Sequence, residues 1–251
     1  VLFRSMPRYR ITVEYDGSNF VGWQRQSNGM SVQEALEIAL QRLTGENPRV
    51  QGAGRTDAGV HAAGQVAHFD LEQPFPLKNL RDGSNFHLRP HLVTVIDVSE
   101  VCSSFDARFS AIRRRYRYRI LNRRSPPALA RGQVWFFAKP LDETKMQAAA
   151  DLLVGKNDFT SFRAIQCQAK SPVKTLEKLK VSRQGDEVLI DVEARSFLHN
   201  QVRITAGTLV LVGEGAWAPD DVGAALKAKN RAAAGPTAPP EGLCLMEVNY
   251  P

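Results

Sequence analysis

The sequence predicts an α+β protein with a mostly antiparallel, mixed sheet, divided into two lobes. Strand-like and helix-like segments alternate irregularly along the chain, which argues against a doubly wound parallel sheet. Apolar residues alternate on both sides of a Gln184–Asp186 turn, which indicates a β-hairpin over 176–194. The predicted change-over at 122–132 separates an N-terminal lobe at 6–122 from a C-terminal lobe at 133–251.

In the N-terminal lobe, period-two alternation predicts a strand at Tyr9–Tyr15. Ser31 and Glu34 form a capping-box pattern, and apolar residues then recur at helical spacing, so a helix is predicted to end near Gly45. The same reasoning predicts short strands and helices further on. These are strands at 49–51, 65–71, 92–100 and from Arg113 onward, and a short helix at 77–86.

In the C-terminal lobe, an amphipathic pattern predicts a helix at Asp142–Leu153, which Gly155 ends. Further helices are predicted from Phe197 through 212 and at 220–229, and a final strand at 243–250. The alanine- and proline-rich stretch 230–240 follows a group of lysines and arginines. We expect it to be a mobile basic loop.

The composition is that of a globular protein with a polyanionic partner. The 251 residues are 43% hydrophobic and 24% charged, and the formal net charge is +7. We expect a cytoplasmic protein, since no secretory leader pattern is visible and no apolar run is long enough to span a bilayer. Residues 1–5 precede Met6, and we expect them to be a non-native remnant.

The sequence offers no pattern for a metal or a nucleotide cofactor. The three cysteines, Cys102, Cys167 and Cys244, lie far apart, and His61 and His68 have no third donor at a ligand spacing. No glycine-rich motif of the Walker or Rossmann kind is present. We therefore expect neither a metal nor a cofactor.

Asp57 is the strongest candidate for chemistry. It lies between Gly54 and Gly59, with Arg55 two positions before it. Glycine allows a backbone or a ligand to approach closely, so this carboxylate is expected on a tight loop anchored by the strand that follows. A turn aspartate that bonds its own backbone would fit Asp-Ala-Gly alone. The run 53–69 is longer and more specific than such a turn requires.

A single carboxylate restricts the possible reactions. It can act as a nucleophile or as a general acid or base. Retaining glycosidases need two carboxylates about 5 Å apart, and no second partner for Asp57 is evident in the sequence. The sequence therefore favours covalent or electrostatic catalysis by one aspartate.

An arginine-rich strand is the second informative feature. Period two separates its side chains onto two faces. One face carries Arg113, Arg115, Arg117 and Arg119, and the other carries Arg114, Tyr116, Tyr118 and Ile120. We expect the tyrosines to point inward. No acidic residues alternate with the arginines, so we expect the arginine face to contact nucleic acid rather than to be merely solvated.

Together these motifs resemble the tRNA pseudouridine synthase A family. The resemblance extends from Met6 to Pro251 and depends on eight segments in family order. They are Glu14–Gly17, Gly22–Gln26, Ser31–Glu34, Gly54–His61, Ala107–Ala111, Arg114–Tyr118, Asn157–Phe162 and Phe197–Arg203. The family implies two α+β lobes around a basic cleft. It also implies isomerisation of uridines 38, 39 and 40 in the tRNA anticodon stem-loop, by a homodimer without metal or cofactor.

The resemblance also assigns roles to residues. Asp57 would be the catalytic nucleophile, Tyr116 would stack on the target base, and Arg203 would pair with Asp57. Tyr118, two residues after Tyr116, is the competing candidate for the tyrosine. Further substrate contacts are expected from Arg55, Leu243, Arg108 and Arg114.

Two other functions fit parts of the sequence. A non-catalytic RNA-binding protein or chaperone would need only the basic strand. A carboxylate hydrolase acting on a sugar would need Asp57 but not the basic balance. Asp57 between glycines favours an enzyme over a binder, and the net charge favours RNA over a neutral sugar.

Overall fold

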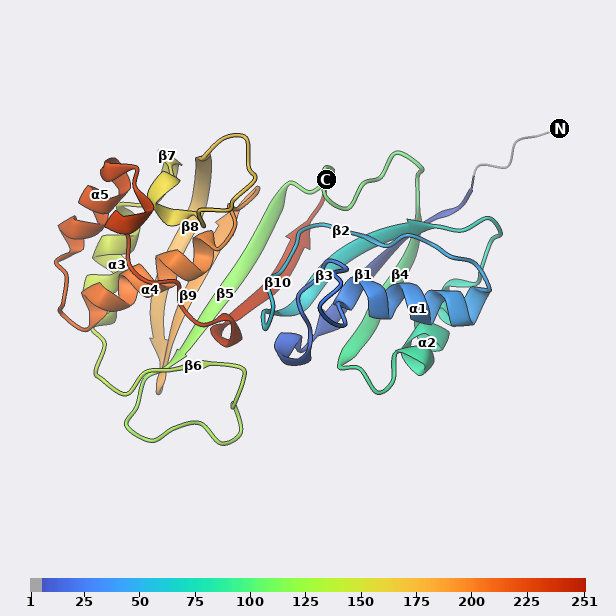
Figure 1. The fold of residues 1–251 in the computed structure, drawn as a ribbon, viewed down its shortest axis with the longest axis horizontal. Coiled ribbons are helices and arrows are strands. Elements are labelled where there is room, and N and C mark those ends of the chain that lie inside the picture. Colours follow the sequence, from blue (N-terminus) through green and yellow to red (C-terminus); the bar gives the residue numbers. More distant parts are fainter. Residues whose placement is uncertain (1–5) are drawn as a thin grey trace. The chain divides into compact units, whose positions relative to one another are not determined.

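The computed structural model describes residues 6–251, so the predicted remnant at 1–5 lies outside the described residues. The chain divides into two compact units (Figure 1). Unit 1 contains the described residues up to Ile112 together with Leu245–Pro251, and unit 2 contains Arg113–Cys244. The sequence analysis placed the change-over at 122–132, which lies inside unit 2. Strand β5 (Arg113–Leu121) is the reason, because it pairs along its length with a strand of that unit.

Unit 1 combines paired β-strands with two helices. Its strands lie in the order β4 (Val93–Val101), β1 (Arg8–Tyr15), β3 (His61–Asp70) and β10 (Leu243–Asn249), and the short β2 (Gln51–Gly52) pairs with β3. Helices α1 (Val32–Thr44) and α2 (Leu77–Leu88) contact each other, and α2 contacts β4 (Figure 1). The short 3-10 helix η1 (Gly17–Asn19) follows β1.

The local signals in unit 1 explain its elements. Alternate side chains of β1 are buried, as the period-two pattern predicts. The predicted capping of α1 is confirmed at Ser31, whose Oγ accepts the Glu34 N–H at 3.2 Å. Strand β3 begins four residues earlier than predicted, because Gly64 interrupts its apolar pattern. A Cβ at Gly64 would lie 2.6 Å from the Met246 carbonyl oxygen, so glycine is required for β10 to approach.

Within unit 2 the strands lie in the order β5, β9 (Glu187–Ala194), β8 (Val173–Gln184) and β7 (Gly155–Asp158). These neighbours are antiparallel, and β6 (Trp135–Phe136) pairs parallel with β5, so the architecture is α+β and mostly antiparallel, as predicted. The predicted β8–β9 hairpin is confirmed.

The helices of unit 2 are α3 (Glu143–Asp151), α4 (Gln201–Gly213) and α5 (Pro219–Ala228), and α3 contacts both α4 and β8. Helix α4 is buried on almost every side. Short 3-10 turns occur at η2 (Thr160–Phe162), η3 (Arg231–Ala233) and η4 (Pro240–Gly242). Of these, η3 lies in the stretch 230–240 predicted as a mobile loop, and η4 begins at its last residue. Within this stretch Gly235 donates its N–H to Thr208 Oγ1 of α4 at 3.0 Å.

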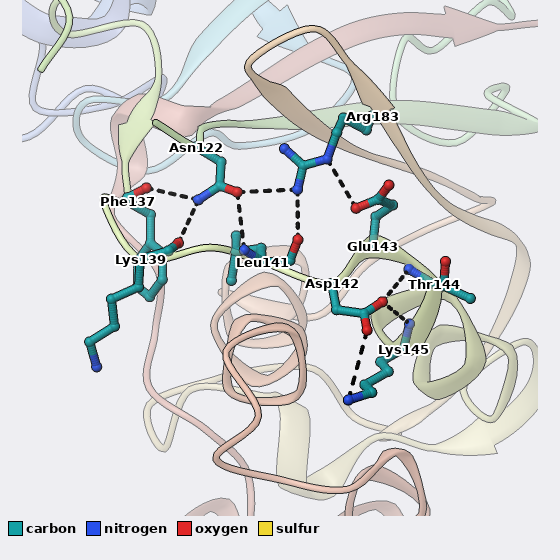
Figure 2. A network of polar contacts seen from close by, with 9 residues as sticks. All are labelled: Asn122, Phe137, Lys139, Leu141, Asp142, Glu143, Thr144, Lys145 and Arg183. Atoms are coloured by element: carbon teal, nitrogen blue, oxygen red, sulfur yellow. Dashed lines mark hydrogen bonds and ion pairs between the residues drawn. The ribbon is translucent and has the colours of Figure 1, made fainter. Parts of the chain in front are cut away.

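A polar network ties the middle of unit 2 together (Figure 2). The Asn122 amide donates to the carbonyls of Phe137 and Lys139 at 2.9 and 2.7 Å, and its oxygen accepts from Leu141 N–H and from Arg183. Arg183 also donates to Glu143 at 3.0 Å. The network therefore joins the end of β5, the start of α3 and strand β8. In residues 6–251 no helix is long and apolar enough to cross a membrane.

Candidate functional site

The Asp57 loop belongs to unit 1 and is held by backbone contacts. It lies between β2 and β3, and Asp57 itself is half-buried. The carbonyl of the preceding residue, Thr56, accepts the Trp23 N–H at 3.0 Å, and the Thr56 hydroxyl bonds the Tyr15 hydroxyl at 2.8 Å. Gly22 has φ +117°, and a Cβ there would lie 2.7 Å from the Thr56 oxygen. Glycine at position 22 therefore allows the neighbouring loop to fix the backbone beside Asp57.

Arg55 lies on the same loop, two residues before Asp57, and is exposed. The loop base is anchored by Gln65, whose side-chain amide donates to the Gly54 carbonyl at 2.9 Å. The Val60 N–H closes the turn by donating to the Asp57 carbonyl at 3.1 Å. The expected tight loop anchored by the following strand is therefore present.

The inner face of β5 carries the two candidate tyrosines of unit 2. Tyr118 is completely buried, and its hydroxyl donates to the Pro239 carbonyl at 2.7 Å. Burial raises the pKa of Tyr118 far above its ordinary value. Tyr116 is 8% exposed, and its ring meets the edge of Phe197 at 5.2 Å between centroids. Of the two, Tyr118 has the clear structural role.

Three further predicted site residues belong to unit 2. Arg203 lies on α4 and donates to the Ala238 carbonyl at 2.8 Å and to Asn200 Oδ1 at 3.2 Å. Leu243 is buried where β10 begins after η4. Both α4 and η4 contact β5, so unit 2 brings the elements of Arg203, Leu243 and Tyr116 together. Arg114 is buried on the inner face of β5 and donates to the Arg195 carbonyl.

The outer face of β5 differs from the expectation. Arg117 bonds Asp191 through two contacts of 2.8 and 3.1 Å, and Arg119 bonds Glu187 at 2.9 and 2.7 Å. Arg113 bonds Glu177 of β8 at 2.8 Å. The premise of that prediction, an arginine face without compensating acids, is therefore wrong, whereas the contact with nucleic acid itself stays a prediction. The compensating acids come from neighbouring strands, which the run of residues 113–119 could not reveal.

Comparisons with known proteins place this arrangement in a family. A profile of the tRNA pseudouridine synthase family matches residues 11–110 and 149–251, which include the Asp57 loop and helix α4. The chain belongs to the tRNA pseudouridine synthase family. It is 57% identical over 245 residues to tRNA pseudouridine synthase A of Parvibaculum lavamentivorans, with 98% of this chain and 100% of the relative covered.

Two further relatives carry the same family name. The chain is 58% identical to tRNA pseudouridine synthase A of Rhodopseudomonas palustris, covering 98% of this chain and 100% of the relative. It is 56% identical to that of Rhodospirillum rubrum, covering 98% of this chain and 88% of the relative. The expected family is thereby confirmed over nearly the whole length of the chain.

The two histidines considered as metal ligands, His61 and His68, have structural partners. His61 Nδ1 accepts the Gly17 N–H at 3.0 Å, and His68 Nδ1 accepts the Ala107 N–H at 3.1 Å. Among residues 6–251, no group of three or more His, Cys, Asp or Glu side chains could hold a metal ion.

A hollow of about 690 Å³ in unit 2 lies beside the network of Figure 2. Its basic lining residues include Arg123, Lys139 and Arg183. Arg123 pairs with Asp186 at 3.3 Å, Lys139 with Glu214 at 3.0 Å, and Arg183 with Glu143 at 3.0 Å. None of the predicted site residues lines the hollow, so we assign it to the framework of unit 2 rather than to the chemistry.

Proposed function

We propose that this chain converts uridine to pseudouridine at positions 38, 39 and 40 of the tRNA anticodon stem-loop, with Asp57 as the catalytic nucleophile. The observation that carries the proposal is the Asp57 loop: a half-buried carboxylate on a backbone fixed by neighbouring loops, inside the region that matches the family. An enzyme of this family is an isomerase acting on tRNA.

The reaction conserves all atoms of the nucleoside. The bond between ribose C1′ and uracil N1 breaks, the uracil turns, and a C1′–C5 bond forms. The C5 proton leaves, and N1 gains a proton. A carboxylate can form a covalent intermediate that divides this exchange into two steps. Because substrate and product are isomers, the reaction consumes no cofactor and no energy source.

The remaining residues have proposed roles around the flipped uridine. Extruding a base costs a few kcal/mol, and stacking on an aromatic ring returns about 1–3 kcal/mol. Tyr116 would stack on the base, and its hydroxyl would help to remove the C5 proton. Leu243 would line the apolar edge of the base, and Arg203 would orient Asp57. Arg55 would hold the base outside its helix. Arg108 and Arg114 would contribute further RNA contacts. We propose a cytoplasmic homodimer, in which one protomer holds the tRNA body while its partner takes the base.

The test uses unmodified tRNA carrying tritium at uridine C5. Wild-type protein should release tritium, because C5 exchanges its proton for the ribose bond. Asp57→Ala should release none, a loss on the order of 10⁴-fold or more, because the nucleophile is missing. Its affinity for tRNA should be largely kept. Release by the variant would refute the assignment of Asp57. Equal inactivity of both proteins would favour a non-catalytic RNA-binding protein.

A further inference from the structure

The loop at 102–112 in unit 1 presents an aromatic ring to solvent. Phe109 is 74% exposed, and the guanidinium carbon of Arg108 lies 5.4 Å from the centre of its ring. A single exposed apolar side chain is common on protein surfaces and does not by itself indicate a binding site. An aromatic ring beside an arginine is the combination on which proteins stack unpaired bases.

The turn that carries this ring is fixed by its own side chains. Asp106 Oδ1 accepts the N–H groups of Arg108 and Phe109, both at 2.8 Å. The Ser110 hydroxyl accepts the Asp106 N–H at 3.0 Å, and the Ser110 N–H donates to the Asp106 carbonyl at 2.9 Å. The backbone of both platform residues is therefore set before any ligand binds.

Ala107, the buried residue two positions before Phe109, is held through both its N–H and its carbonyl group. Ala107 donates its N–H to His68 Nδ1 at 3.1 Å and accepts the Tyr250 hydroxyl at its carbonyl at 2.7 Å. The Phe105 ring packs against both His68 and Tyr250, at 6.1 and 5.0 Å between centroids. Burial lowers the pKa of His68 and so favours the neutral ring, and the bond from the Ala107 N–H selects the tautomer in which Nδ1 accepts.

A third contact anchors the start of the loop. Arg8 donates to the carbonyls of Ser103 and Phe105 at 2.7 and 2.8 Å, and Asp70 orients Arg8 through bonds of 2.7 and 2.8 Å. A preformed surface loses little conformational entropy on binding. The loop therefore presents Phe109 to a ligand with little loss of conformational entropy.

We propose that Phe109 and Arg108 form a stacking platform for an unpaired base of bound tRNA, and that His68 and Tyr250 are positioning residues for it. The proposal relies on the proposed function only for the identity of the ligand. The arginine beside the ring and the net charge of +7 favour an RNA over a second copy of this chain, which carries the same charge.

The test compares Phe109→Ala with Phe86→Ala, a matched control on α2 of the same unit, where the ring is 67% exposed. Phe109→Ala should weaken tRNA binding roughly 5- to 100-fold, as loss of one stacked base does. Phe86→Ala should leave the affinity unchanged. Phe109→Trp should retain the wild-type affinity for tRNA, because it keeps an aromatic ring. Phe109→Leu should weaken binding, because it keeps an apolar side chain without a ring. Thermal melting should be unchanged in all four variants, since both rings are exposed.

A fully paired RNA duplex of the same length serves as the second ligand. Its affinity should not respond to Phe109→Ala, because a duplex offers no unpaired base. The platform is overturned if Phe109→Ala binds tRNA as wild type does, or if it loses duplex binding equally. It is also overturned if light scattering shows that Phe109→Ala changes the oligomeric mass, which would assign the ring to a contact between copies.

The same variants separate this proposal from the proposed function. Phe109→Ala should raise the tRNA concentration needed for half-maximal tritium release by about the factor by which it weakens tRNA binding, because the ring binds RNA. If wild-type protein releases no tritium while Phe109→Ala still weakens tRNA binding, the proposed function fails and the platform stands.

Discussion

Two arginine-bearing segments follow each other in the chain and use their charge differently. In β5, Arg117 and Arg119 each make paired bonds to a carboxylate of β9. In the loop before β5, Arg108 lies over an exposed aromatic ring, and Asp106 Oδ1 accepts the backbone N–H groups of Arg108 and Phe109. A run of cations therefore does not by itself predict an RNA contact. The acids supplied by neighbouring strands decide whether the charge is already compensated.

The two tyrosines on the inner face of β5 give the comparison with the largest expected effect. Tyr116→Phe should lower turnover about 10²- to 10⁴-fold while tRNA binding is kept, if its hydroxyl assists proton removal from C5. Tyr118→Phe should leave turnover nearly unchanged and lower the free energy of unfolding by about 1 kcal/mol, because it loses its bond to Pro239. Tritium release and urea unfolding measure the two effects. The opposite pattern would transfer the catalytic role to Tyr118.

Arg108→Ala and Arg117→Ala test the contrast between the two segments directly. Arg108→Ala should weaken tRNA binding and make the slope of log K against log salt concentration shallower by about 0.7–0.9. Arg117→Ala should leave tRNA affinity within about twofold and lower stability by about 1 kcal/mol, because Asp191 loses its partner.

Affinity measured across a salt series, together with urea unfolding, gives both quantities. If Arg117→Ala showed the larger change in salt dependence, the outer face of β5 would be an RNA contact after all.

The smallest effect concerns the ion pair between Arg8 and Asp70, which anchors the loop at 102–112. The hydrogen bond from Arg8 lowers the pKa of Asp70 below its usual value of about 4. The contribution of the Arg8–Asp70 ion pair to the free energy of unfolding is therefore present above about pH 4. It is lost as the pH falls through the lower pKa that Asp70 has in the folded state. Because both side chains are partly exposed, Asp70→Asn should cost about 1 kcal/mol or less at neutral pH.

Unfolding in urea at pH 7 and at pH 3 would measure that contribution. The difference between wild type and Asp70→Asn should shrink at the lower pH, and a difference that grows would contradict the assignment.

Much of the local structure could be predicted from sequence. The capping of α1 at Ser31, the β8–β9 hairpin and the two faces of β5 all follow from short-range patterns. The Asp57 loop could be predicted because glycines and the strand after it adjoin it in sequence. These features depend on residues within a few positions of one another, which a sequence displays directly.

The features that were missed depend on distant pairing. The acids opposite Arg117 and Arg119 lie 74 and 68 residues away and are brought near by the register of β5 with β9. Most of the final strand belongs to unit 1 although it follows all of unit 2. Phe109 lies within Ala107–Ala111, one of the eight segments that carry the family resemblance. Its exposure depends on Ala107 being fixed by His68 and Tyr250.

The most direct test of the central claim is nucleotide-resolution mapping of pseudouridine in an unmodified tRNA that has uridine at 38, 39 and 40. The tRNA is incubated with wild-type protein or with Asp57→Asn, without metal or cofactor. The account predicts pseudouridine at those positions with wild type and none with Asp57→Asn. Modification by Asp57→Asn, or by wild type at other positions only, would contradict it.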